Sequence, residues 1–544
     1  MTKQCIACSK TFKIDQWDLD YYKKISVPEP THCPSCRQQR RLATANQMFL
    51  YKNTCAATGK SIISSYHPDD GYTVYDQTYW YSDQWDPLQY GVDFDFSKPF
   101  FEQYYAFAKR IPRPNLLTGF EYDDNSPYTN HAGKNKNCHM IFDSDGNENC
   151  YYSYGINGCK QCLDCYRVRK SELCFECIDC ENCYGSWYLQ DCKGCNHGVF
   201  LKDCVDVRSS LMCVGLRHKE YHILNKPVTP EEFKTALKQL QTPAGMAKLK
   251  QQFADFCLKF PNKFIHGTHN EVVTGDYLNN CKQAIECYDC NDVENGKFFC
   301  QAFDSAKDCM DCQEVGDKAE LVYDSATLGY TAYNIQFSYN GLGNLMNFTY
   351  CQYCFKSQNL FGCFGLRNKK FCILNKQYSE ADYQVLRTKI IEHMKATGEW
   401  GEFWPMRYAW FAYNETLAQD YFPLTKSETE ARTLHWRDPI ASPAPSADET
   451  LLRCATCSKQ FKLIAQEMTM YQAAHIPLPE QCFTCRHRAR LAERNPRSLW
   501  HRQCMCTQTD HGHQGLCTNE FDTTYAPERK EIVYCEGCYQ KEVY

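Results

Sequence analysis

The chain has 544 residues, 43% of them hydrophobic and 23% charged, a composition typical of a folded protein with several domains. Its formal net charge of -5 argues against a protein that coats nucleic acid along its whole length. No run approaches about 18 consecutive apolar residues, and the start, MTKQCIACSK, lacks the apolar segment of a signal peptide, so we expect a cytoplasmic protein without membrane spans.

Cysteine is the outlier of the composition, with 38 residues. In a secreted chain this number would indicate a disulfide framework. Because no signal peptide is recognised, we expect reduced thiols that bind metal or fill a core.

The two ends of the chain carry copies of one pattern, CxxC-x24-CxxC, and a shift of 449 residues superimposes them without a gap. Tyr22 and Arg37 recur at the same shift as Tyr471 and Arg486. Two CxxC turns can aim four thiolates at one point, the ligand set of tetrahedral zinc, and the spacer leaves room for a hairpin. A redox role is disfavoured because the pairs occur in matched sets without a βαβ pattern. The predicted zinc ligands are Cys5, Cys8, Cys33 and Cys36 in the first copy and Cys454, Cys457, Cys482 and Cys485 in the second.

Beyond these turns the two copies differ. The C-terminal copy contains enough further cysteines for a second zinc site. Its predicted ligands are Cys517, Cys535 and Cys538 with either Cys504 or Cys506. The N-terminal copy keeps Cys55, but Thr58, Asp76 and Tyr79 stand at the other positions, so we expect no matching site there. In the C-terminal insertion two histidines could replace one thiolate, although solvated loop side chains are the simpler interpretation. They are His511 and His513.

The middle of the chain is a cysteine-rich repeat. Every third residue from Cys138 to Leu216 is uncharged, and these 27 positions hold 13 cysteines. A period of three fits neither a helix nor a strand, but a backbone with short faces and tight corners, as in a β-solenoid, can produce it. Cys159, Cys177 and Cys195 follow one another at intervals of 18 residues, which predicts coils of about that length. A shift of 150 residues relates this repeat to a second, weaker copy.

Three interpretations of the central cysteines stay open. Thiols are small enough to fill a narrow solenoid interior. Zinc or an iron–sulfur cluster is the second possibility, because four of them form CxxC-x14-CxxC; these are Cys159, Cys162, Cys177 and Cys180. The same pattern recurs in a competing register, from Cys174 to Cys195, which favours core filling over a dedicated site. Disulfides are the third possibility.

A helix is predicted after each repeat. Thr229-Pro230-Glu231-Glu232 and Ser379-Glu380-Ala381-Asp382 both resemble helix starts with a capping residue. In the second helix one apolar face is expected to pack on the open end of the repeat. That face consists of Val385, Leu386, Ile390 and Met394.

We therefore expect an α+β, β-rich chain with small zinc-ribbon or treble-clef-like modules at both ends, flanking a central cysteine-rich β-solenoid-like repeat capped by helices. The expected boundaries are 1–82 for the N-terminal module, 83–137 for an aromatic connecting region, 138–260 and 261–437 for the two repeats, 438–450 for a Pro/Ala/Ser linker, and 451–544 for a C-terminal double module.

Arginines follow the second CxxC of each copy. Those considered for contact with nucleic acid are Arg37, Arg40 and Arg41 in the first copy and Arg486, Arg490 and Arg494 in the second. Guanidinium groups suit phosphate, so RNA or the ribosome is one candidate partner. A solvated basic helix, ion pairs with the chain's own carboxylates and a protein partner are the alternatives.

The pattern CxxC…F…Y…P.P..C..CR…R, followed by YAPERKEIVYCEGCYQKEVY, resembles a zinc-ribbon family whose members occur in uncharacterised, cysteine-rich, multidomain bacterial proteins. The likeness is most specific over 5–82 and 454–544. It implies Zn²⁺ binding and no established activity.

No P-loop, GxGxxG, GxSxG or HExxH motif occurs, and no nucleophile is paired with a recognisable base. The leading hypothesis is a zinc-binding structural or interaction protein rather than an enzyme. The alternatives are an RNA- or ribosome-associated protein and a thiol redox or iron–sulfur protein.

Overall fold

The structure is a computed structural model that describes residues 1–302, 313–315, 326–328, 339–341, 346–438 and 451–543. Helix and strand contribute almost equally, at 27% and 28%, so the fold is mixed rather than β-rich, and the described residues form no closed barrel. The predicted linker at 438–450 lies outside the described residues except for Asp438, and so do Cys309 and Cys312 of the second repeat.

The N-terminal region is built from short strands and helices. Its elements are β1 (Thr2–Gln4), β2 (Thr11–Lys13), α1 (Gln16–Lys24), α2 (Pro34–Leu42), β3 (Tyr51–Thr54), β4 (Ser61–Ser64), β5 (Val74–Tyr75), α3 (Gln77–Trp80), α4 (Phe100–Ala108) and β6 (Arg113–Pro114). Strands β1 and β2 form an antiparallel hairpin, as do β3 and β4. The spacer of the first CxxC-x24-CxxC pattern holds β2 and the helix α1, not the hairpin that its length suggested.

The first repeat winds in short rungs that pair in parallel. Its strands are β7 (Thr118–Gly119), β8 (Tyr128–Gly133), β9 (His139–Asp145), β10 (Tyr151–Tyr154), β11 (Trp187–Gln190), β12 (Val199–Lys202), β13 (Leu211–Val214), β14 (His222–Ile223) and β15 (Lys226–Pro227). The step from rung to rung is 12, as in the pairing of Asp145 with Asn157 and in the bond from the Cys159 N–H to the Asn147 side chain. The coil length predicted from the interval between Cys159 and Cys177 was wrong, because that interval spans one and a half rungs.

Sharp corners explain the period of three. A left-handed backbone conformation recurs at every third residue from Asn137 to Leu224, as at Asp164 (φ 55°) and Arg167 (φ 53°). This conformation costs a non-glycine residue about 1–2 kcal/mol, so the parallel pairing of the rungs must offset it. Four corners in each rung leave a narrow interior with room for four side chains.

That interior is lined by thiols. The buried cluster runs from Cys138 to Cys213. Cys177, for example, donates a hydrogen bond from Sγ to the carbonyl oxygens of Phe175 and Ser186, at 3.4 Å each. Ser153 lies two rungs earlier in the same interior column. Its hydroxyl donates a hydrogen bond in the same way to the carbonyl oxygen of Tyr151, at 2.9 Å. The geometry therefore supports the interpretation of these cysteines as small core residues. All described cysteines are free thiols.

The step from rung to rung is irregular in the second repeat. Its elements are β17 (Gly267–Thr268), β18 (Glu271–Asn279), β19 (Lys282–Asn291), β20 (Cys300–Ala302), β21 (Gln313–Val315), β22 (Ala326–Leu328), β23 (Tyr339–Gly341), β24 (Met346–Thr349), β25 (Gln358–Phe361), β26 (Lys370–Ile373) and β27 (Lys376–Gln377). Gly267 pairs with Leu278, a step of 11, and Leu278 pairs with Cys290, a step of 12. Tyr288 pairs with Cys300, also a step of 12, but Cys300 pairs with Gln313, a step of 13. The extra residue accounts for the weaker pattern of this copy in the sequence.

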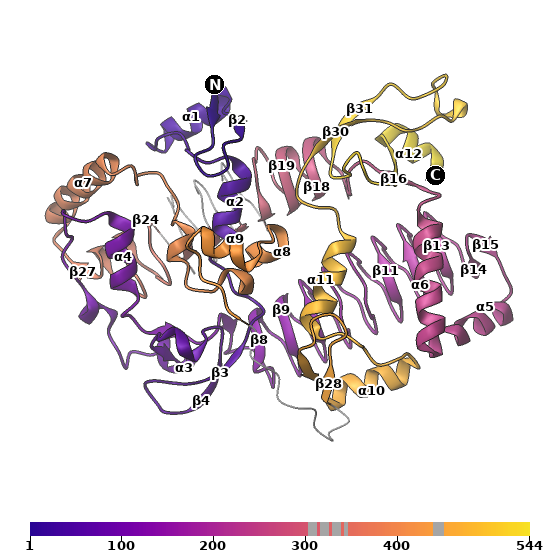
Figure 1. Ribbon diagram of the computed structural model, residues 1–544, viewed down its shortest axis with the longest axis horizontal. Helices are drawn as coiled ribbons and strands as arrows, with labels where there is room; N and C mark the ends of the chain where they lie inside the picture. The colour runs from indigo at the N-terminus through magenta and orange to yellow at the C-terminus, as the bar shows by residue number, and fades with distance from the viewer. Residues whose placement is uncertain (303–312, 316–325, 329–338, 342–345, 439–450, 544) are drawn as a thin grey trace.

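Helices follow both repeats, as predicted. They are α5 (Pro230–Leu237), α6 (Pro243–Cys257), α7 (Glu380–Ala396), α8 (Leu417–Tyr421) and α9 (Lys426–Ala431). Thr229 and Ser379 cap α5 and α7 with their side chains. Helix α6 lies along β12 and β13 and α7 lies against β26, at opposite sides of Figure 1. Ile390 and Met394 are buried, whereas Val385 is 58% exposed and was wrongly assigned to the packed face.

The C-terminal region repeats the N-terminal plan. Its elements are β28 (Leu451–Arg453), β29 (Gln460–Lys462), α10 (Ala465–Ala474), α11 (Phe483–Glu493), β30 (Trp500–Gln503), β31 (Glu520–Thr523), β32 (Ile532–Tyr534) and α12 (Glu536–Val543). In Figure 1 helix α11 lies in front of the strands of the first repeat. Strand β32 pairs in parallel with β16 (Pro261–Lys263), which follows α6.

The rung interior should tolerate small polar side chains and reject large ones. We expect Cys177→Phe to lower the free energy of unfolding by about 1–3 kcal/mol, because overpacking strains a closed core. Cys177→Ser should stay within about 1 kcal/mol, since a hydroxyl keeps the hydrogen bonds to the same carbonyls. Urea denaturation followed by circular dichroism measures both values, and equal stability of the two variants would contradict this picture of the interior.

Candidate metal centres and a cationic pocket

The first predicted thiol cluster forms where a hairpin turn meets the start of a helix. Cys5 and Cys8 lie in the turn between β1 and β2, which is held by a bond from the Cys5 N–H to the Lys10 carbonyl. Cys33 precedes α2 as its N-cap, and Cys36 lies in its first turn. The four Sγ atoms lie within 4.8 Å of one another.

The second copy has the same construction. Cys454 and Cys457 lie in the turn between β28 and β29, and Cys482 is the N-cap of α11 with Cys485 in the first turn. Their Sγ atoms again lie within 4.8 Å of one another. Each tetrad could hold a metal ion.

The sulfur–sulfur distances have the size that a metal requires. The Cys8 and Cys33 Sγ atoms are 3.7 Å apart, and so are those of Cys457 and Cys482. A tetrahedron with metal–sulfur bonds of about 2.3 Å has edges of about 3.8 Å. A disulfide would instead bring two sulfurs to about 2.05 Å.

A third thiol tetrad lies near the C-terminus. It consists of Cys504, Cys517, Cys535 and Cys538, all buried and all within 4.8 Å of one another. Of the two cysteines left open by the sequence, the geometry therefore places Cys504 in the tetrad. Cys506 belongs to a separate group with His513 and Cys538.

Local hydrogen bonds favour the thiolate form of some of these cysteines. Burial alone raises the pKa of Cys454, but the backbone N–H groups of Cys457 and Cys482 outweigh it and lower the pKa to about 6. Burial also opposes ionisation of Cys535, yet the Asn519 amide and the Cys538 N–H lower its pKa to about 7. Metal ligation needs thiolates, so these environments suit it.

The N-terminal copy preserves the frame of the third tetrad without its thiols. The Asp76 N–H donates to the Cys55 sulfur at 3.2 Å, as the Cys535 N–H donates to the Cys504 sulfur at 3.2 Å. Strands β3 and β4 pair in the register of β30 and β31, which gives Thr58 the place that Cys517 has in the other copy. The alignment of Thr58 and Asp76 with cysteines thus agrees with the backbone.

This preserved frame should accept a metal once the thiols return. We expect the triple variant Thr58→Cys, Asp76→Cys, Tyr79→Cys to bind one more equivalent of zinc than the parent chain, because Cys55 would gain three partners in a ready-made turn pair. Native mass spectrometry counts the ions. The same triple change with Cys55→Ser is the control, and an unchanged count in the triple variant would show that the frame is not equivalent.

The central cysteines do not gather into such groups. Within the described part of the chain, groups of three or more His, Cys, Asp or Glu ligand atoms within 4.8 Å occur only in the two terminal regions. The predicted CxxC-x14-CxxC site fails because its spacing does not match the length of a rung. Cys159, Cys162, Cys177 and Cys180 fall in four different interior columns.

The arginines predicted to contact nucleic acid are buried. Arg37, Arg40 and Arg41 of α2 are between 1% and 6% exposed. Arg40 pairs with Glu402 at 2.8 Å, and the Arg37 guanidinium bonds the hydroxyl of Tyr22.

The arginines of the second copy engage successive rungs of the first repeat. Arg486 bonds Asp164 at 3.0 Å, and Arg490 bonds Glu176, one rung further on, at 3.0 Å. Arg494, which follows α11, bonds Asp179 at 2.7 Å. Side chains buried against the chain's own carboxylates cannot reach a phosphate backbone, so the assignment of these residues to nucleic-acid contact is corrected to internal ion pairing.

One carboxylate joins three parts of the molecule. Asp289 of β19 lies 2.6 Å from Arg494, 2.7 Å from Arg497 and 3.6 Å from Arg167 of the first repeat. Burial by itself raises the pKa of Asp289, but the three guanidinium groups outweigh it and hold the pKa far below its usual range. This four-residue group is called the Asp289 clasp below.

Removing an arginine from the Asp289 clasp should destabilise the fold. We expect Arg494→Ala to lower the free energy of unfolding by about 3–5 kcal/mol, because it leaves two buried carboxylates short of a partner. Arg488→Ala on α11 is the matched control: its side chain is 45% exposed and its ion pair should contribute less than about 1 kcal/mol. Chemical denaturation at neutral pH measures both, and similar losses would contradict the clasp as a joint.

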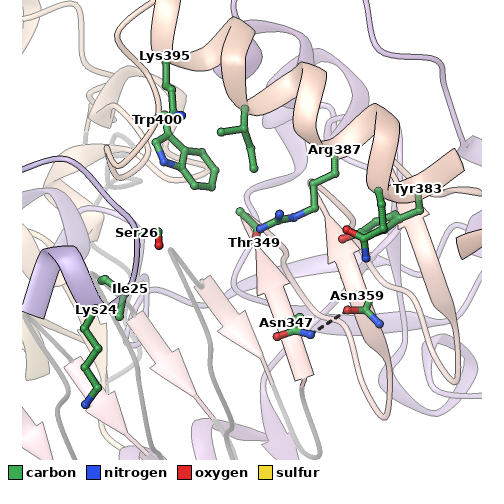
Figure 2. A pocket seen from close by; sticks show the side chains of 12 residues that line it. Lys24, Ile25, Ser26, Asn347, Thr349, Asn359, Tyr383, Arg387, Lys395 and Trp400 are labelled. Carbon is green, nitrogen blue, oxygen red and sulfur yellow. Dashed lines mark hydrogen bonds between the residues drawn. The ribbon is translucent and has the colours of Figure 1, made fainter. Parts of the chain in front are cut away.

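A cavity of about 540 Å³ lies between α1, α7 and the strands β24 and β25. Its cationic side chains are Lys24, Arg387 and Lys395, and none of the described residues that line it carries a carboxylate. Figure 2 shows Arg387 and Lys395 projecting from α7, with the amides of Asn347 and Asn359 joined by a hydrogen bond of 2.9 Å on neighbouring strands. This cationic pocket was not foreseen, because Lys24 of α1 is distant in sequence from Arg387 and Lys395 of α7 and no motif links them.

Comparison with known protein families, with curated proteins and with solved structures gives no match. The likeness to a zinc-ribbon family is therefore supported by the thiol clusters and their spacing alone. No helix in the described ranges is both long and apolar enough to cross a membrane.

Proposed function

We propose that the protein is a zinc-binding scaffold in which metal-stabilised terminal modules, of the zinc-ribbon or treble-clef type, hold together a β-solenoid-like body. Three thiol tetrads, each with its sulfurs within 4.8 Å of one another, carry this proposal. Zinc is the metal that four thiolates favour in a reduced compartment without redox chemistry.

The modules are connected to the body through the helices that start at the metal centres. Cys482 and Cys485 fix the first turn of α11, and Arg486 follows directly in the same helix. A metal bound there would set the position of α11, and through it the ion pairs with Asp164 and Glu176. Metal binding and attachment of the module to the repeat are therefore expected to be coupled.

The alternatives from the sequence are weaker. An RNA-binding role loses its candidate residues, since those arginines are buried in internal contacts. An iron–sulfur role in the middle of the chain loses its candidate ligands, which lie in separate columns.

Metal content tests the scaffold proposal. We expect at least three equivalents of zinc per chain purified without added metal, measured by elemental analysis. Cys482→Ser should lose one equivalent and destabilise the chain, whereas Cys55→Ser, which lies outside the ligand groups of the described residues, should lose none. Fewer than three equivalents in the unchanged protein, or an equal effect of the two variants, would contradict the proposal.

The cationic pocket favours a second function, the binding of a small anion. Lys24 and Arg387 line a cavity of about 540 Å³ together with Lys395, whose ammonium also pairs with Glu392 at 2.8 Å. With asparagine amides on one wall, these cations suit phosphate or carboxylate groups. We expect inorganic phosphate to bind in calorimetry at low salt, and Arg387→Ala to weaken binding at least tenfold. Lys389→Ala, an exposed position on α7 that does not line the pocket, is the control. Phosphate binding that is absent, or unchanged in Arg387→Ala, would contradict this function.

A further inference from the structure

The thiol of Cys538 belongs to two ligand groups at once. It completes the tetrad with Cys504, Cys517 and Cys535, and it also lies within 4.8 Å of Cys506 and His513. A single tetrahedral ion in the tetrad would not bind Cys506 or His513, because the four thiols already fill its coordination positions.

The additional ligands come from one segment that the N-terminal copy lacks. The loop between β30 and β31 is ten residues longer than the matching turn between β3 and β4, and it contains Cys506, His511 and His513. The insertion therefore adds metal-binding side chains beside a tetrad that is complete without them.

The histidine nearest to Cys538 is oriented as a ligand. His513 Nε2 lies 3.4 Å from the Cys538 sulfur, and the edge between sulfur and nitrogen in a tetrahedral zinc site is about 3.5 Å. On the other side of the ring Nδ1 lies 3.0 Å from the Gly515 carbonyl oxygen. A proton on Nδ1 donated to that carbonyl leaves the lone pair of Nε2 facing the thiol, the arrangement that supports metal-bound histidines.

The other histidine, His511, contacts Cys506 of the second ligand group. His511 Nδ1 lies 3.2 Å from the Cys506 sulfur, and its Nε2 lies 3.8 Å from Glu542. Its side chain is only 5% exposed. The interpretation as a solvated loop residue is therefore wrong for His511, whereas His513 is half-buried.

We propose that the C-terminal module holds two zinc ions that share the thiolate of Cys538. This inference rests on the proposed function, since the first ion is the one in the tetrad. Cys506, His513 and the shared thiolate bind the second ion, and His511 positions Cys506. Three protein ligands leave one coordination position for water or a small anionic ligand, as in zinc sites that are open to exchange.

Cadmium replacement tests the bridge directly. In ¹¹³Cd NMR of the fully loaded chain we expect four resonances, two of which show a scalar coupling to each other through the shared sulfur. His513→Ala and Cys506→Ser should each remove one of the coupled resonances and the splitting of the other. His501→Ala, a 64% exposed histidine on β30, should leave the spectrum unchanged.

The metal count separates this inference from the scaffold proposal. We expect four equivalents of zinc in the unchanged chain and three in His513→Ala or Cys506→Ser. Three equivalents in the unchanged chain, unaffected by His513→Ala, would overturn the second ion and leave the tetrads intact. Four cadmium resonances without mutual coupling would also overturn the shared thiolate. Fewer than three equivalents would mean that the scaffold proposal itself has failed.

Discussion

The arrangement of the molecule depends on the Asp289 clasp. A carboxylate from the second repeat is buried among Arg167 of the first repeat and Arg494 and Arg497 of the C-terminal region. Separating any of these parts would expose or orphan buried charge, which costs several kcal/mol per ion. The two repeats and the terminal region are thus tied to one another through one buried electrostatic contact.

The second constraint is the width of the rungs. Four left-handed corners in each rung enclose space for four side chains, and a thiol meets the requirement because it is small and can still donate to a backbone carbonyl. The corner residues lie outside the thiol cluster, and two of them, Asp164 and Glu176, pair with arginines of α11. Asp164 and Glu176 occupy equivalent corners on consecutive rungs, about 4.8 Å apart, and Arg486 and Arg490 are one helical turn apart, about 6 Å. The spacing of the rungs and the pitch of the helix therefore match closely enough for successive ion pairs.

Ligand chemistry and residue spacing coincide at the two ends of the chain. Cysteines at CxxC-x24-CxxC specify a turn and a helix start that meet, so both terminal tetrads could be predicted, as could the loss of thiols around Cys55. The period of three could be recognised in the sequence, but the number of residues in each rung could not. Only the parallel pairing of residues such as Asp145 and Asn157 fixes the step. The ion pairs of the arginines could not be predicted from the sequence. Arg494 pairs with Asp289, 205 residues away, and Arg486 pairs with Asp164, 322 residues away, and no sequence pattern marks either carboxylate.

The two terminal regions share a backbone arrangement but differ in their metal-binding side chains. The turn at Cys55 and the turn at Cys504 share their hydrogen bonds, yet only the second is surrounded by thiols. The thiol groups of the terminal regions could hold metal ions, whereas the thiols of the rungs pack in a core. Anomalous diffraction at the zinc edge from crystals of the unchanged chain tests this division most directly. We predict a peak about 2.3 Å from the sulfurs of each terminal tetrad and none inside the rungs. Empty tetrads, or zinc among the central cysteines, would contradict the division.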